Sequence, residues 1–258
     1  MEILRTEKIS INFGGLVAVK EVDFSVKEGE ILGLIGPNGS GKTTFFNLIT
    51  GIYKPTKGNI FFGEENIAGL SPHEITKKGI ARTFQNTRLF WDLSALDNVL
   101  LGMHRWQSIS WFNSMFRRNY TAQGLRKNVK EVFNLVNDFV GKELVDRMYQ
   151  KVRDLSQADK KRVEICRALA SRPKLLLLDE PSAGMNPEET VELMEDIKKI
   201  KKKNAKIDVI IIEHDMRVIK GITQNVVVFN YGEKIFEGTF EDASANKEVR
   251  EAYLGGEI

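Results

Sequence analysis

Short apolar runs alternate with longer amphipathic segments in the second half of the chain. The runs Leu175–Leu178, Ile207–Ile212 and Val226–Phe229 have the length of buried strands. The segment Pro187–Lys203 has the length of a helix, with acidic residues at its start and lysines at its end. Because the links between these segments are short, the alternation predicts a parallel sheet with right-handed crossovers, and therefore an α/β fold.

The first half of the chain leads from strand-like sequence into a glycine-rich segment. Apolar and β-branched residues are frequent over Ile3–Val26 and Glu30–Ile35, which predicts strands, and GPNGSGKTT follows at Gly36–Thr44. A helix is expected from there to Gly51, and a short helix at Ser71–Gly79. The glycine-rich segment is thus expected to connect a strand to a helix.

Residues 102 to about 152 differ in composition from their surroundings. They are rich in aromatic side chains and continue with a helical apolar pattern between Val129 and Phe139. We expect a helical insert at about 102–152 in a single domain of 1–258, with the core and a β subdomain formed by 1–101 and 153–258. The aromatic residues are Trp106, Trp111, Phe112, Phe116 and Tyr120.

Composition excludes several classes of protein. Of 258 residues 42% are hydrophobic, which is enough for a sizeable core, and the net charge of +3 is too balanced to indicate a nucleic-acid surface. The single cysteine, Cys166, excludes an intramolecular disulfide and is expected to be a buried apolar residue. The charged start argues against a signal peptide, and no run reaches the roughly 20 apolar residues of a transmembrane helix. A membrane role would therefore come through a partner.

The glycine-rich segment satisfies the pattern G-x-x-x-x-G-K-[ST]. Its glycines allow successive backbone N–H groups to face a phosphate, and the following helix adds partial positive charge at its N-terminus. Lys42 is expected to reach the β- and γ-phosphates, and the Thr43 hydroxyl to bind Mg²⁺. A plain glycine turn is the alternative, which the flanking strand and helix disfavour. The expected nucleotide-binding residues are Gly36, Pro37, Asn38, Gly39, Ser40, Gly41, Lys42, Thr43 and Thr44.

Two carboxylates and a histidine follow the predicted buried strands. Asp179 and Glu180 come directly after the first apolar run, and His214 comes shortly after the second. Sheets of α/β proteins bind their ligands at the carboxyl ends of such strands. We expect Asp179 to bind Mg²⁺, Glu180 to orient and deprotonate the attacking water, and His214 to hydrogen-bond the γ-phosphate. Alternatively, the acids only end a strand before a turn, and the histidine is structural.

These motifs and their order resemble the ATP-binding subunits of ABC transporters over nearly the whole chain. The sequence contains ARTFQN around Gln85, then LSQAD with Ser156 at the signature position, LLLLDEP, SAGMNP and finally His214. The resemblance implies a P-loop NTPase (RecA-like) core with an antiparallel β subdomain and an inserted α-helical subdomain, and the cofactors ATP and Mg²⁺. It also implies that Gln85 acts in catalysis and metal binding, and that Ser156 binds the γ-phosphate held by a second subunit. Phe13 corresponds to the aromatic residue that stacks on adenine, with an ordinary core phenylalanine as the alternative.

The segments FGGLVAVKEVDFSV, ARTFQNTRLF and EVREAYLGGEI are most similar to the larger ATPase subunit of branched-chain amino-acid transporters, a sub-family that also includes importers of urea and related amides. This resemblance implies a peripheral ATPase on the cytoplasmic face of the cell membrane. The implied partners are transmembrane permease subunits, docked through the insert and the Gln85 loop, and a second ABC ATPase subunit, identical or different. No nucleic acid is expected. The aromatic residues of the insert either form the docking surface or pack inward as a core.

The signature segment departs from the family's usual LSGGQ. It reads Leu155-Ser156-Gln157-Ala158-Asp159, which adds side chains where the backbone must approach ATP and an acid near an anionic ligand. A local explanation is a capping box between Ser156 and Asp159. We expect a site with this signature to hydrolyse ATP slowly or to need a partner with an intact signature, and restoring Gly, Gly and Gln to raise the rate. The alternative functions are a regulatory subunit that binds ATP with weak hydrolysis, the ATPase of an importer of urea or amides, and an ABC protein outside transport.

Overall fold

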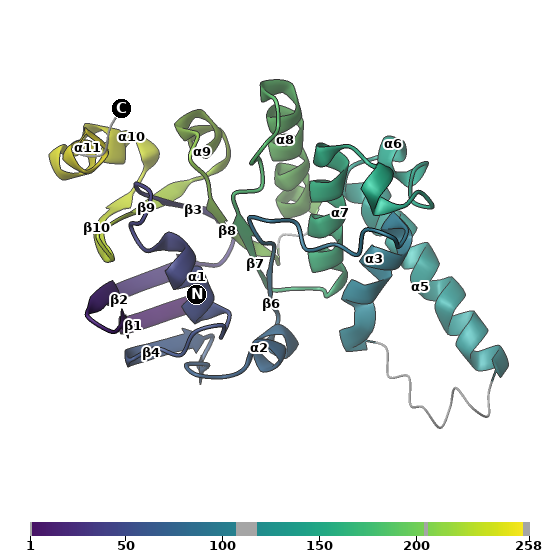
Figure 1. Cartoon of the computed structure of the whole chain (residues 1–258), viewed down its shortest axis with the longest axis horizontal. Helices are drawn as coiled ribbons and strands as arrows, with labels where there is room; N and C mark the ends of the chain where they lie inside the picture. Colours follow the sequence, from purple (N-terminus) through teal and green to yellow (C-terminus); the bar gives the residue numbers. More distant parts are fainter. Residues whose placement is uncertain (1, 107–117, 204–205, 255–258) are drawn as a thin grey trace. The chain divides into compact units, whose positions relative to one another are not determined.

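The computed structural model describes residues 2–106, 118–203 and 206–254 (Figure 1). These residues belong to two compact units. Unit 1 contains Met1–Arg82, Lys174–Pro181 and Asn204–Ile258, and unit 2 contains Thr83–Pro173 and Ser182–Lys203. The helical insert predicted at about 102–152 lies within unit 2. The chain therefore passes between the units several times.

The larger sheet of unit 1 contains the strands predicted from the apolar runs. Within the described residues its order is β10-β9-β3-β8-β7-β6, and all neighbouring pairs are parallel except β10 with β9. Every residue of β3, β7 and β8 is buried, as expected at the centre of a parallel sheet. The bounds are β3 Ile31–Ile35, β6 Ile80–Arg82, β7 Leu175–Asp179, β8 Asp208–Ile212, β9 Asn225–Asn230 and β10 Glu233–Gly238. The predicted parallel sheet is confirmed, and β6 and β10 are edge strands in addition.

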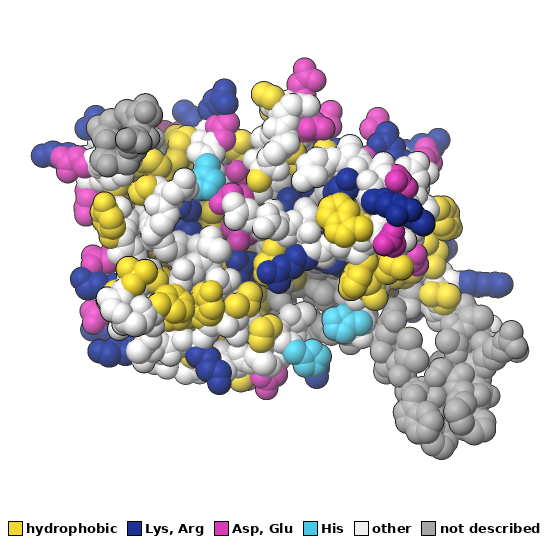
Figure 2. Space-filling view, viewed as in Figure 1, with side chains coloured by type: hydrophobic (Ala, Val, Ile, Leu, Met, Phe, Trp, Pro, Cys, Tyr) yellow, Lys and Arg dark blue, Asp and Glu magenta, His cyan; other side chains and the backbone are white. Residues whose placement is uncertain are grey.

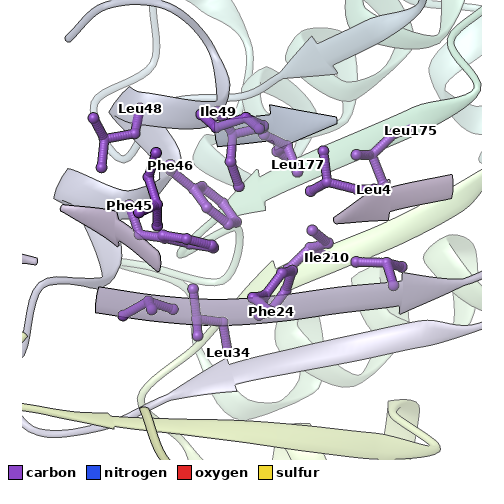
Figure 3. Packing of buried hydrophobic residues seen from close by; sticks show 14 of the residues in the cluster. Leu4, Phe24, Leu34, Phe45, Phe46, Leu48, Ile49, Leu175, Leu177 and Ile210 are labelled. Carbon is purple, nitrogen blue, oxygen red and sulfur yellow. The ribbon is translucent and has the colours of Figure 1, made fainter. Parts of the chain in front are cut away.

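A smaller antiparallel sheet comes from the strand-like opening of the chain. Its described strands, in the order β2-β1-β4-β5, are β1 Glu2–Phe13, β2 Leu16–Lys27, β4 Lys57–Phe62 and β5 Glu65–Asn66. Helix α1 (Lys42–Ile49) packs with strands of both sheets in one apolar core (Figure 3). The Phe45 ring lies 5.0 Å from that of Phe24 on β2 and 5.2 Å from that of Phe229 on β9, between centroids. The glycine-rich loop before α1 is therefore anchored on a packed core.

Short helices complete unit 1. They are α2 Pro72–Lys78, α9 Met216–Ile222, α10 Phe240–Ala245 and α11 Lys247–Leu254. Ser71 and Glu74 form a reciprocal capping box at the start of α2. Helices α10 and α11 follow β10 and contact it.

Unit 2 is helical (Figure 1). Its elements are α3 Ala95–Gly102, the 3-10 turn η1 Met103–Trp106, α5 Arg118–Phe139, α6 Lys142–Val145, the 3-10 turn η2 Val152–Asp154, α7 Gln157–Ala170 and α8 Pro187–Lys203. Helices α3, α7 and α8, which we expected in the core, belong to this unit because α7 packs against α3, α5 and α8. Where α3 meets α7, a Cβ on Gly102 would lie 2.1 Å from the Arg167 carbonyl oxygen, so the approach requires glycine.

Three further predictions concern single features of the chain. The described part contains no helix that is both long enough and apolar enough to cross a membrane. Cys166 is buried as predicted, and burial raises the pKa of its thiol. The question of the insert's aromatic residues falls on Trp111, Phe112, Phe116 and the side chains of Trp106 and Tyr120, which lie outside the described residues.

Candidate functional site

The glycine-rich segment forms a tight loop between β3 and α1. Gly36, Gly39 and Gly41 have φ angles of 147°, 78° and 102°, which side chains disfavour. At Gly36 a Cβ would lie 2.1 Å from the Phe229 carbonyl oxygen of β9. Within α1 no side chain caps the N-terminus and the first turn carries no acid, so its N–H groups can receive an anion, as a nucleotide phosphate requires. Of the other loop residues, Asn38 and Thr43 are exposed, Pro37 and Thr44 are half-buried, and Ser40 is buried.

The ammonium group of Lys42 turns back into this loop. Its Nζ donates to the carbonyl oxygens of Gly36 at 2.7 Å and of Pro37 at 2.8 Å. Burial lowers the pKa of Lys42 from 10.5 to about 8, while the carboxylates of Glu180 and Asp179 oppose this change. The structure thus brings together the loop lysine and both acids that follow β7.

Asp179 ends β7 and pairs with a cation that the sequence analysis missed. Its Oδ2 accepts from Nη2 of Arg82 at 2.7 Å, and both side chains are almost fully buried. Arg82 ends the neighbouring parallel strand β6 and also donates to Oδ1 of Asn47 on α1 at 2.7 Å. The arginine therefore orients Asp179 relative to the helix that carries Thr43. A lone arginine in ARTFQN was the available signal, but only the pairing of β6 with β7 places it beside the acid.

Glu180 and His214 form a direct pair. Nε2 of His214 donates to Oε1 of Glu180 at 2.7 Å, since an ionised carboxylate can only accept. Glu180 has a φ of 46°, a left-handed conformation that is strained for a side chain with a Cβ. Its N–H donates to the Ile212 carbonyl of β8 at 2.9 Å, which holds this backbone in place. Strain of this kind is typical of functional sites.

Phe13 ends β1 and is 44% exposed, so it is not a core phenylalanine. Its ring meets that of Tyr53 edge to face, with centroids 5.1 Å apart. Exposed apolar side chains also occur at Leu16, Val17 and Ile52, and Figure 2 shows hydrophobic side chains gathered over the smaller sheet and α1. An exposed ring braced by a second aromatic side chain can stack on a base. The contact of Phe13 with adenine stays a prediction.

The C-terminal helix contributes a second residue that the sequence analysis missed. The hydroxyl of Tyr253 on α11 is buried and approaches the backbone of Gly36. Burial raises the pKa of this phenol, and the Gly36 backbone opposes the rise. Tyr253, near the end of the described chain, thus lies against the first glycine of the glycine-rich loop.

Gln85 and Ser156 lie in unit 2, and both are exposed. Ser156 is the N-cap of α7, and its Oγ accepts the N–H of Asp159 at 3.1 Å. The Asp159 carboxylate does not close the predicted capping box; it pairs with Arg147 at 2.5 Å and Arg162 at 3.8 Å. These two guanidinium groups compensate the charge of the acid, which weakens the repulsion that we expected it to exert on an anionic ligand.

The oxygen donors of unit 1 fit Mg²⁺ in part. This ion prefers hard oxygen ligands and is commonly held by one or two carboxylates together with substrate phosphates. The Thr43 hydroxyl and the Asp179 carboxylate supply such oxygens. No cluster of three or more His, Cys, Asp or Glu able to hold a metal occurs in the described part of the chain.

Known protein families match this chain over most of its length. The family model described as "ABC transporter" matches residues 19–183, and the model described as "Branched-chain amino acid ATP-binding cassette transporter" matches residues 233–258. The high-affinity branched-chain amino acid transport ATP-binding protein BraF of Pseudomonas aeruginosa is 37% identical over 254 residues, which cover 98% of each protein.

Solved structures of ATP-binding cassettes have a fold similar to that of this chain. The ADP conformation of MJ1267, an ATP-binding cassette of an ABC transporter, has a TM-score of 0.83 at 32% identity and covers 99% of both chains. The dimeric post-hydrolysis state of the ATP-binding cassette MJ0796, bound to ADP and Pi, has a TM-score of 0.73 at 26% identity. That match covers 92% of this chain and 98% of the other.

Proposed function

The chain belongs to the ATP-binding subunits of the ABC transporter family, and on that premise we propose that its ATP hydrolysis powers an importer of branched-chain or other amino acids. The proposed hydrolysis is supported by one observation above all: the side chains of Lys42, Asp179 and Glu180 lie close together at the carboxyl end of the larger sheet. The match of residues 233–258 to a branched-chain amino acid family supports the transported class.

In this proposal the phosphate loop and Lys42 bind the phosphates of ATP, and Phe13 stacks on adenine. Thr43, Asp179 and Gln85 would hold Mg²⁺, which when bound would neutralise charge that develops on the transferred phosphoryl group. Arg82 keeps the Asp179 carboxylate oriented.

Glu180 acts as the general base in this proposal. Its carboxylate orients the attacking water and accepts a proton from it, and the water oxygen then bonds to the γ-phosphorus while the bond to ADP breaks. The hydrogen bond from His214 holds this carboxylate in one orientation, and His214 contacts the γ-phosphate. The left-handed backbone of Glu180 aims the side chain.

We infer that the working form contains two ATP-binding subunits and a pair of permease subunits at the cytoplasmic face of the membrane. Ser156 of one subunit would then contact the γ-phosphate held by the other, in keeping with the dimeric cassette of similar fold. A second candidate function, ATP binding with weak hydrolysis, is favoured by the exposed side chain of Gln157 next to Ser156.

The test compares Mg²⁺-dependent ATP hydrolysis and ATP binding in the purified chain and in Glu180→Gln. We expect the substitution to lower the rate by about 100-fold or more while ATP binding persists, because a general base contributes on that order. Glu28→Gln, at an exposed glutamate, is the control and should keep the parental rate. ATP binding without hydrolysis in the parent would favour the second candidate, and no ATP binding would contradict both.

A further inference from the structure

Helix α7, labelled in Figure 1, begins with the signature segment. Beyond that segment it carries a fully buried pair of opposite charges. Lys161 and Glu164 are each 1% exposed, and Nζ of the lysine donates to Oε2 of the glutamate at 3.0 Å. Removing both charged groups from water costs free energy. The other N–H groups of the lysine and the second carboxylate oxygen of the glutamate therefore need hydrogen-bond partners inside the protein.

Both side chains find those bonds on the backbone of one loop residue. Nζ of Lys161 donates to the carbonyl oxygen of Phe84 at 3.0 Å, and the N–H of Phe84 donates to Oε1 of Glu164 at 3.2 Å. The ring of Phe84 also lies 4.0 Å from the guanidinium carbon of Arg88. The backbone N–H and the backbone carbonyl of Phe84, which belong to two successive peptide groups, are therefore both bound by side chains of a single helix.

Phe84 directly precedes Gln85, which is exposed and lies outside helices and strands. Fixing the preceding peptide restricts where the Gln85 side chain can reach.

Stability alone does not explain a buried pair of this kind. Replacing such a pair by apolar side chains of similar size is often neutral or stabilising. The neighbouring buried pair of α7, Arg162 with Asp196 of α8 at 3.0 Å, joins two helices through side chains. Lys161 and Glu164 differ from that pair because they form hydrogen bonds with the loop backbone at Phe84, about 80 residues away in the sequence.

We propose that Lys161 and Glu164 are positioning residues for Gln85, and that they tie its location to α7, the helix capped by Ser156. The inference rests on the proposed function, in which Gln85 and Ser156 act on Mg²⁺ and ATP. Gln85 and Ser156, which are far apart in the sequence and both proposed to contact the nucleotide or its metal, are then attached to the same helix of unit 2. A displacement of α7 would move both contacts together.

The first test uses Glu164→Ala and the milder Glu164→Gln, which keeps an acceptor oxygen for the Phe84 N–H. Loss of a supporting hydrogen bond commonly weakens metal binding by about tenfold or more. We therefore expect Glu164→Ala to raise the Mg²⁺ concentration for half-maximal ATP hydrolysis by about tenfold. Binding of ATP without Mg²⁺ should stay at the parental value, and Glu164→Gln should restore most of the Mg²⁺ response.

A double-mutant cycle with Gln85→Ala separates positioning from a general loss of structure. If Glu164 acts through Gln85, adding Glu164→Ala to Gln85→Ala changes the Mg²⁺ requirement by less than about twofold. Hydrogen exchange of the Phe84 amide gives a readout without nucleotide, and it should become faster in Glu164→Ala. Asp196→Asn, which breaks the neighbouring buried pair, is the matched control and should leave the Mg²⁺ requirement unchanged.

An unchanged Mg²⁺ requirement in Glu164→Ala would overturn the inference while leaving the proposed function intact. A shift of the same size in the Gln85→Ala background, or in Asp196→Asn, would overturn it as well. A parent chain that binds no ATP would contradict the proposed function, and the positioning role would fall with it.

Discussion

Lys42 combines a buried position with a positive charge. Its Nζ is held by carbonyl oxygens of the phosphate loop, and burial lowers its pKa to about 8. Bound phosphates would place negative charge next to the Lys42 ammonium group and would therefore raise its pKa. The affinity for ATP should therefore depend on whether Lys42 is protonated before binding.

We expect ATP to bind about tenfold more weakly at pH 9 than at pH 7. Below a pKa of about 8 the ammonium form predominates and attracts the phosphates, and above it most of the free protein has lost that charge. Calorimetric titration at both pH values, in buffers of different ionisation enthalpy, measures the affinity and the proton taken up on binding. Lys42→Arg stays charged over this range, so its affinity should change little. Equal weakening in both proteins would contradict this role of Lys42.

Helix α7 begins at a signature segment whose acid has an unexpected role. Asp159 is buried and pairs with Arg147, which precedes the helix, and with Arg162 inside it. The acid therefore holds the chain before the helix against its first turns. Ser156 remains the cap of the helix through the Asp159 N–H.

We expect Asp159→Asn to lower the free energy of unfolding by about 1–2 kcal/mol, since Arg147 and Arg162 would lose a charged acceptor while the backbone cap persists. Urea denaturation measures the difference. The exposed Asp154, whose nearest cation lies at 3.9 Å, is the matched control, and Asp154→Asn should change stability by less than about 0.5 kcal/mol. Equal effects of the two substitutions would show that the Asp159 pairs contribute nothing beyond a surface charge.

At the scale of the whole molecule, each chain carries one phosphate loop in unit 1 and one signature segment in unit 2. If the catalytic site is shared between two copies, the loop of one and Ser156 of the other must work together. A dimer of one chain with a defective loop and one chain with a defective signature would then still contain one intact site, formed by the intact loop and the intact signature.

We expect Lys42→Ala and Ser156→Arg to be inactive separately and active when mixed. Half of the randomly formed dimers are mixed, and each contains one intact site of two, so the mixture should reach about a quarter of the parental ATPase rate. Mixing Lys42→Ala with a chain that carries both substitutions is the control, because no intact loop is then present. An inactive first mixture, from a parent that hydrolyses ATP alone, would contradict a shared site between identical chains.

Local signals in the sequence were sufficient for the main elements of the fold and for the phosphate loop. The apolar runs of β7 and β8, the amphipathic α8 and the glycine pattern before α1 each depend on residues close together in the chain. Strands β4, β5, β6 and β10 were not predicted because they are short or lie near sheet edges, where the apolar pattern is weak.

The contacts that orient the site depended on the tertiary structure. Arg82 lies 97 residues before Asp179, and only the order of strands brings them together. The same holds for Phe84 with Glu164, which are 80 residues apart. The sequence by itself determined which side chains are chemically suited to the proposed phosphate binding and proton transfer, because that chemistry belongs to residue type and local backbone. Which groups support them was decided by the packing of distant segments, because a hydrogen bond requires atoms within about 3 Å.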